Sequence, residues 1–213
     1  MTKEELQKEF NRQVENLIQK GYPEAAKLTQ EAFIEEIESL RSKLEGLLLG
    51  ELDLDKGYIP FVIVVSHMLV ATDVAMSLVI KDGKEGVTKL FPLEPKDFSV
   101  IDAVEVPPYD FYLVIDIDRG KKTLNVHPQD AFIEIKNASR SPLTIDEGVA
   151  IITQFPEFLM RNNCFSLLAS RHTGDKRVPA IWINGKNHPN LGWCWDGNPH
   201  TWLGSASCNM RIA

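Results

Sequence analysis

The segment DFYLVIDID, residues 110–118, carries the clearest indication of the fold. It is a nearly continuous apolar run that closes on Arg119-Gly120, and such a run is typical of a strand that is covered on both faces. We therefore expect residues 110–118 to form the central strand of a sheet. Residues 59–65, IPFVIVV, are rich in β-branched side chains and predict a second buried strand.

Further strands are expected around this pair. Residues 74–80 are apolar, and the turn residues KDGKEG separate them from residues 87–90, which predicts more strands and a hairpin. Residues 164–170 and 178–184 flank the turn HTGD and predict an antiparallel hairpin. Residues 189–211 alternate aromatic and small side chains, which predicts one or two additional strands joined by DGNP.

Helical spacing dominates the first 50 residues. Apolar residues recur three or four positions apart up to Ile18, and GYP at residues 21–23 interrupts the pattern. The same spacing then resumes and ends at Gly50, which predicts a second helix over residues 23–49, about 40 Å long at 1.5 Å per residue. This helical hairpin, residues 1–56, either packs on the main domain or joins two copies in a dimer.

Two shorter helices are expected between the strands. Residues 128–138 place Ala and Ile at helical spacing after a Pro. Thr144-Ile145-Asp146-Glu147 is a capping box and predicts a helix start, and Pro156 should kink or divide that helix. Together the elements predict an α+β fold, with an antiparallel or mixed sheet in residues 57–213 that is covered by helices and preceded by the helical hairpin.

The composition predicts an ordinary soluble protein. The chain has 213 residues, of which 44% are hydrophobic and 25% are charged, so it can bury a core without a metal or disulfide, and we expect no cofactor. The net charge is −7, and no cluster of Lys and Arg occurs, so nucleic acid is not an expected partner. No apolar run is long enough to span a membrane, and the acidic N-terminus is unlike a signal peptide, which predicts a cytoplasmic location. Cys164, Cys194 and Cys208 lack disulfide or zinc spacing and are expected to be free thiols.

Three strings of the sequence are unusually specific: PAIWI at residues 179–183, LGWCWDGNPHTWLGSASC at residues 191–208 and SPLTIDEG at residues 141–148. They resemble a bacterial family known only as a domain of unknown function, and the resemblance extends to residues 59–62 and 116–120. The resemblance implies a bacterial cytoplasmic protein with one shared fold. It implies no reaction, cofactor or partner.

All four Trp residues lie within residues 182–202, among several Asn, Asp, His and Ser residues. On a strand, Trp193 and Trp195 share a face while Cys194 points away, so two indoles should lie side by side. Such a surface can bind sugars, nucleobases or cations, but the indoles can equally form a core in which each N–H is bonded internally. The candidate ligand-binding residues are Trp182, Asn184, Trp193, Trp195, Asp196, Asn198, His200, Trp202 and Ser205.

Cys208, His200 and Asp196 form a candidate catalytic group of nucleophile, base and orienting acid. A reactive thiol needs a base within hydrogen-bond reach and an electropositive setting, which spacing alone does not reveal. His200 can instead cap the Asn198-Pro199 turn. The His residues lack metal-ligand spacing, so no metal site is expected, and no phosphate loop or GxSxG nucleophile elbow occurs.

Three functional hypotheses follow. The first is a module that binds a small molecule or a protein segment through the Trp, Asn and His surface near the C-terminus. The second is a cysteine-dependent hydrolase or transferase that uses Cys208 with His200 and Asp196. The third is a structural homodimer formed through the helical hairpin, so the expected state is a monomer or a homodimer.

Overall fold

The computed structural model describes all 213 residues, and its first sheet is built around β6, Phe111–Asp118. β6 is antiparallel to β1, Tyr58–Val65, and the other pairs in this sheet are antiparallel as well. The short strands β7, β13 and β14 complete it in the order β1-β6-β13-β7, with β14 also on β6; their bounds are Ser141–Pro142, Ser207–Cys208 and Met210–Ile212. The first five residues of β6 are buried, so the predicted central strand is confirmed.

The second sheet is mixed and has the strand order β12-β8-β10-β11-β4. β10 and β11 form an antiparallel hairpin, whereas β12 with β8 and β11 with β4 are parallel. The bounds are β4 Val87–Thr88, β8 Cys164–Ser166, β10 Arg177–Ile183, β11 Pro189–Trp195 and β12 Leu203–Ser205. Two further pairs are β2 Ile80–Lys81 with β3 Lys84–Glu85, and β5 Phe98–Val100 with β9 Ser170–His172. The structure contains 33% helix and 28% strand, so the predicted α+β class is confirmed.

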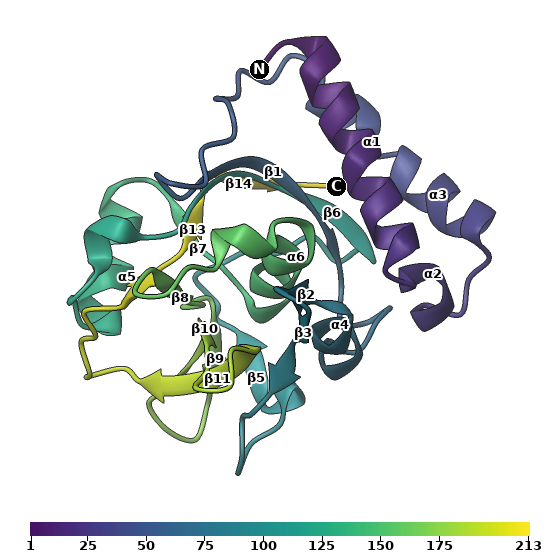
Figure 1. The fold of residues 1–213 in the computed structure, drawn as a ribbon. Coiled ribbons are helices and arrows are strands. Elements are labelled where there is room, and N and C mark those ends of the chain that lie inside the picture. Colours follow the sequence, from purple (N-terminus) through teal and green to yellow (C-terminus); the bar gives the residue numbers. More distant parts are fainter.

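Helix α6, Ile145–Gln154, occupies the middle of the molecule, where it packs on β1 and on β10 (Figure 1). Its first turn is the predicted capping box, in which the Thr144 side chain accepts a hydrogen bond from the Glu147 backbone N–H and the Glu147 carboxylate accepts one from that of Thr144. The helix touches its neighbours closely, because a Cβ on Gly148 would lie 2.6 Å from a methyl carbon of Leu167. The helical segment is divided near Pro156, as predicted, because α6 ends at Gln154 and a 3₁₀ turn, η4, Pro156–Phe158, follows.

The N-terminal helix α1, Lys3–Gln19, packs on β1 and α6 at one side of the molecule (Figure 1). It buries Leu6, Phe10 and Val14, which supplies the hydrophobic contribution to this interface. The buried Gln13 amide joins the helix to β1, since its Nε2 donates to the Phe61 carbonyl at 3.0 Å and its Oε1 accepts from the Ile63 N–H at 2.8 Å.

The predicted single helix over residues 23–49 is wrong. The chain forms α2, Tyr22–Ala25, α3, Gln30–Glu38, and a 3₁₀ turn η1, Arg41–Leu44. Lys27 adopts a left-handed conformation with φ 58°, which ends the first turn, and the Thr29 side chain caps α3 by accepting from the Ala32 N–H. The apolar spacing still identified buried residues, because Phe33 packs edge to face on Phe111 with ring centroids 5.2 Å apart. Ile37, Leu40 and Leu44 are buried as well, so these apolar residues face the protein's own core.

The predicted strand over residues 74–80 is also wrong, because most of it is helix α4, Thr72–Leu78. Ala75 and Met76 lie on its buried side, and of the predicted strand only Ile80 belongs to a strand, β2. A short apolar run fits a buried helix as well as a strand, and here packing against α6 decides for the helix. The remaining helical elements are η2 Pro95–Asp97, η3 Lys121–Thr123 and the predicted α5, Pro128–Asn137. None of the helices combines the length and apolar character that a bilayer crossing requires.

Candidate functional site

A groove of about 900 Å³ opens where the ends of several elements meet. It is lined by the connection from β1 to α4, the segment through η2 and β5, the residues before β6 and the first turn of α6. Its lining residues are Ser66, His67, Met68, Ala71, Thr72, Asp73, Glu94, Pro95, Lys96, Phe98, Ser99, Val100, Val106, Pro107, Pro108, Tyr109, Asp110, Tyr112, Thr144, Ile145, Asp146 and Ser170. The volume of this cleft is in the range of small-molecule sites, and about half of its lining residues are polar or charged.

An imidazole and a carboxylate form a pair in this groove. His67 follows the last residues of β1, and Asp146 lies in the first turn of α6. One oxygen of Asp146, Oδ2, lies 2.7 Å from His67 Nδ1 and accepts a hydrogen bond from the His67 backbone N–H at 3.0 Å. The backbone contact fixes the position of the ring, and Nδ1 is held by the carboxylate, so Nε2 is the ring nitrogen that is free for a ligand.

The Asp146 carboxylate raises the pKa of His67, chiefly through the hydrogen bond and also through its charge, while partial burial opposes the shift. The His67 side chain is 57% exposed, whereas that of Asp146 is 15% exposed. A supported imidazole that reaches solvent can accept or deliver a proton near neutral pH.

Hydroxyl groups and a buried ion pair support this part of the groove. The Ser170 Oγ accepts from the Ile145 N–H at 3.0 Å, and the Tyr112 hydroxyl donates to Glu147 at 3.3 Å. Glu147 is buried and forms an ion pair with Arg211 on β14. The C-terminal strand therefore holds the helix turn that carries Asp146.

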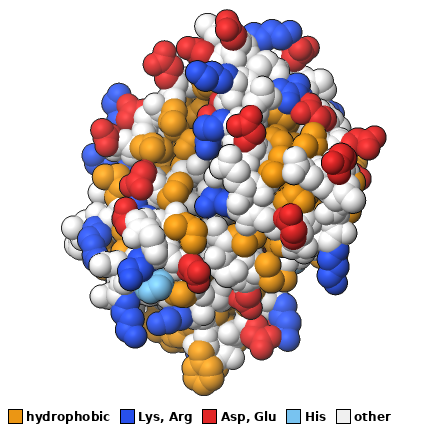
Figure 2. Space-filling model, turned by 45° about the vertical axis from the view of Figure 1, so that its right-hand side comes forward, with side chains coloured by type: hydrophobic (Ala, Val, Ile, Leu, Met, Phe, Trp, Pro, Cys, Tyr) orange, Lys and Arg blue, Asp and Glu red, His pale blue; other side chains and the backbone are white.

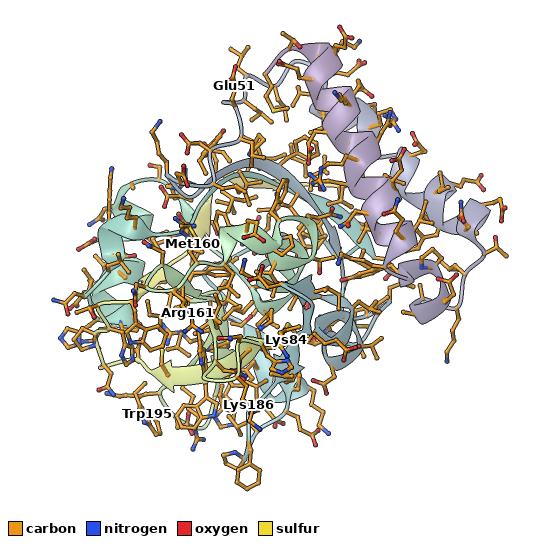
Figure 3. The ribbon with its side chains drawn as sticks, in the orientation of Figure 1. Glu51, Lys84, Met160, Arg161, Lys186 and Trp195 are labelled. Atoms are coloured by element: carbon orange, nitrogen blue, oxygen red, sulfur yellow. The ribbon has the colours of Figure 1, made fainter.

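The predicted side-by-side arrangement of Trp193 and Trp195 is confirmed, with ring centroids 5.1 Å apart on one face of β11. The Arg177 guanidinium lies over both indoles, 4.5 Å from the first centroid and 5.1 Å from the second. Trp193 Nε1 donates to the Leu90 carbonyl at 3.0 Å, so this indole N–H is bonded within the protein. Trp195 is 41% exposed at the outer edge of β11 (Figure 3).

Trp182 lies on the opposite face of the β10–β11 hairpin. Pro179 is the cross-strand partner of Trp193, and Trp182, three positions further along β10, points to the other side. It packs against Trp202 at 6.3 Å between centroids, and His200 lies 5.1 Å from Trp202. The Trp182 ring covers Gly192, where an added Cβ would lie 2.2 Å from Cη2. The four indoles therefore form two groups on two faces. We call residues 177–205 the aromatic segment.

The other predicted ligand-binding residues are engaged locally or lie apart from these groups. Asn184 Oδ1 accepts from the backbone N–H of Lys186 and of His188 within its own turn, and Asp196 pairs with Arg171 at 3.0 Å. Asn198 is exposed in the turn after β11, and Ser205 is buried on β12. The structure does not bring all nine predicted residues to one surface.

The geometry argues against the Cys208, His200 and Asp196 group. Cys208 is fully buried on β13, and burial raises the pKa of its thiol to about 12. The charged groups that act on it are Glu147, Arg211, Arg140 and Asp116, and His200 is not among them. A buried thiol without a base stays protonated and is a poor nucleophile. No group of three or more His, Cys, Asp or Glu side chains is placed to hold a metal ion.

Residues 16–213 match a family of unknown function, DUF5701. The chain belongs to this family. The predicted resemblance to a family of unknown function is confirmed, and the match extends beyond residues 57–213 into the N-terminal helices. No curated protein and no solved structure matches the chain. Both the groove and the aromatic segment of this DUF5701 protein lie within the matched residues.

The sequence reasoning missed His67 and Asp146 as a pair. Each has a local explanation, since one follows a buried strand and the other belongs to a capping box. The available signals were His67 two residues after a buried strand and a loop-rich passage with Pro95, Pro107 and Pro108. Their contact spans 79 positions of the chain and is set by how β1 packs on α6.

Proposed function

We propose that this protein binds a small molecule in the groove that contains His67 and Asp146. The observation that carries the proposal is the open cavity of about 900 Å³ with an exposed, carboxylate-supported imidazole in its wall. Natural ligand clefts have volumes of about 300–1,000 Å³ and use a few polar groups to orient the ligand. His67 Nε2 and the nearby hydroxyl groups supply such polar contacts.

The aromatic segment supports a ligand site less well. Its indoles contact one another, Arg177 and the Leu90 carbonyl, so much of their binding capacity is used inside the protein. The hypothesis of a separate binding surface there now rests on two observations. Trp195 is exposed, and the buried Asn190 amide beside Trp182 has no hydrogen-bond partner.

A thermal-denaturation screen against a metabolite collection tests the proposal, because a ligand that binds the folded state raises the melting temperature. Hits are measured again with Tyr109→Ala, which removes an exposed ring from the groove wall, and with Trp195→Ala, which removes an exposed ring from the aromatic segment. We expect hits to lose their effect in Tyr109→Ala and to keep it in Trp195→Ala. The opposite pattern, or a collection without any hit, would contradict the proposal.

A second candidate function is proton-transfer catalysis on the bound molecule, which the 2.7 Å contact of Asp146 with His67 favours. In a hydrolysis, His67 Nε2 would take a proton from water as its oxygen attacks the substrate, and would then return that proton to the leaving group. Hydrolysis of ester or phosphoester probes should then fall in both His67→Gln and Asp146→Asn. Equal activity of both variants and the native protein rules out this role.

A further inference from the structure

The charged side chains that line the groove are mostly carboxylates. Four of them belong to Asp or Glu, namely Asp73, Glu94, Asp110 and Asp146, and Lys96 is the only Lys or Arg. With His67 neutral, the lining therefore carries a formal charge of 1 − 4 = −3. A cleft with one sign of charge concentrates ligands of the opposite sign.

Two of these carboxylates already have a hydrogen-bonding or ionic partner within the protein. Glu94 pairs with Lys96 at 2.6 Å, and Asp146 is bonded to His67. Asp73 and Asp110 have no cationic partner within 4.0 Å, and both are exposed. The only lining Lys is used by Glu94, so the groove offers no free Lys or Arg to an anion.

The segment that contains η2 and β5 is acidic as a whole. Residues 94–110 contain five acidic residues against Lys96 alone, a net charge of 1 − 5 = −4 within 17 residues. On the face drawn in Figure 2, by contrast, acidic and basic side chains are interspersed. Of the five acids in residues 94–110, Glu94 and Asp110 line the groove.

The groove also offers apolar and hydrogen-bonding groups. Met68 is 79% exposed and Tyr109 is 62% exposed, and both line it. Such side chains are available to cover an apolar body, and the face of a Tyr ring attracts cations. Thr72 lines the groove with only 8% of its surface exposed, and its hydroxyl has no hydrogen-bond partner in the protein. A hydroxyl that lines a groove without a protein partner can form a hydrogen bond with a ligand.

We infer that the groove takes a small organic cation, an amine or guanidinium group carried on an apolar body. Asp73 and Asp110 attract the charge, Met68 and Tyr109 cover the apolar part, and Thr72 supplies a hydrogen-bonding group. This inference rests on the proposed function, because it names the ligand class of the same groove.

The test uses the full chain and matched sets of three compounds, each an amine, the alcohol with a similar skeleton and the related carboxylate. One set is phenethylamine, phenethyl alcohol and phenylacetate. Calorimetry should give an amine affinity that exceeds that of its alcohol and its carboxylate by about fivefold or more, the effect of one unit charge at close range in water. The preference should weaken as the salt concentration rises.

Charge variants locate the effect. Asp73→Asn combined with Asp110→Asn should abolish the preference for amines. The matched control combines Asp102→Asn with Glu105→Gln, two exposed acids of the same protein region that do not line the groove, and it should keep the preference. Equal loss in both double variants would overturn the assignment to Asp73 and Asp110.

The outcomes separate this inference from the proposed function. If alcohols or carboxylates bind as tightly as amines, and Tyr109→Ala abolishes their binding, the groove is a ligand site but the cation inference is overturned. If no compound of the panel binds the native protein, the result contradicts both. A third outcome is that amines bind the native protein, but Trp195→Ala abolishes the binding and Tyr109→Ala leaves it intact. This result would also contradict both the proposed function and the cation inference.

Discussion

The groove and the aromatic segment place their polar groups in opposite ways. In the groove, the His67 imidazole and the Asp146 carboxylate come from positions 79 residues apart, and one side of the imidazole stays open to solvent. In the aromatic segment, unusual residues lie close together in sequence, but Trp193 and Asp196 are bound to neighbouring groups. The Trp-rich composition of the aromatic segment therefore reflects how the two faces of its hairpin pack. The candidate site is instead built from common residue types at the ends of elements that are distant in sequence.

The two regions also differ in how they are held. The groove depends on the first turn of α6, and the buried ion pair between Glu147 and Arg211 holds this turn in place. The aromatic segment depends on close contact within one hairpin, where Trp182 covers Gly192. Substitutions at these two supports should therefore separate groove function from hairpin packing.

The largest effect is expected for Glu147→Gln. Removing this carboxylate leaves the buried Arg211 guanidinium without its charge partner, so the free energy of unfolding should fall by about 3–5 kcal/mol. Urea denaturation measures the change. Glu45→Gln is the matched control, since its ion pair with Lys3 is solvent-exposed and should contribute at most about 1 kcal/mol. Similar losses in the two variants would contradict this account of α6.

Gly192→Ala should perturb the aromatic segment alone. The new Cβ would lie 2.2 Å from the Trp182 ring, so the indole must move, at a cost of about 1–3 kcal/mol. Gly197→Ala is the control, because an added Cβ there meets no atom within 4 Å. Trp fluorescence and urea denaturation should change in the first variant only, and groove ligands should bind both variants equally. Loss of ligand binding in Gly192→Ala would show that the two regions are coupled.

Trp193→Phe should destabilise the protein by about 1 kcal/mol. The substitution removes the indole N–H that donates to the Leu90 carbonyl. Trp195→Phe should change the free energy of unfolding by less than about 0.5 kcal/mol, because this ring is partly exposed at the edge of the hairpin. A larger cost for Trp195→Phe, measured in the same urea titrations, would mean that its ring is a packing element.

A further small effect concerns pH. Asp146 raises the pKa of His67 in the folded state, so the pair stabilises the protein fully below the unfolded His pKa of about 6.5. This contribution is lost as the pH rises through the higher folded pKa. Because the ring is more than half exposed, the contribution should be below about 1 kcal/mol. The difference in free energy of unfolding between the native protein and His67→Gln should shrink between pH 6 and pH 8.5. A difference that grows over this range would contradict a stabilising interaction between His67 and Asp146.

Local signals made much of the fold predictable. The apolar run at residues 110–118, the capping box at Thr144 and Glu147, and the alternation around Trp193 each depend on neighbours in sequence, and each prediction is confirmed. The break near Lys27 was not predictable from apolar spacing, because a single left-handed residue and the Thr29 cap divide the helix without changing that spacing.

The candidate site was less predictable for a physical reason. The position of Asp146 in a capping box is a local fact, but its contact with His67 depends on how α6 packs against β1. The Trp residues offered a strong compositional signal, yet strand alternation and the partner strand divide them between two faces. The residue types of a segment do not reveal which side-chain polar groups are hydrogen-bonded within the protein and which are free for a ligand.

The most direct test of the groove as the ligand site is an NMR titration with a hit from the screen. Of the five His and four Trp residues in the chain, His67 is the only one that lines the groove. The account predicts that the His67 imidazole signals shift with ligand concentration while the four indole N–H signals stay in place. Shifts of the indole signals with an unchanged His67 would place the ligand on the aromatic segment and contradict the account.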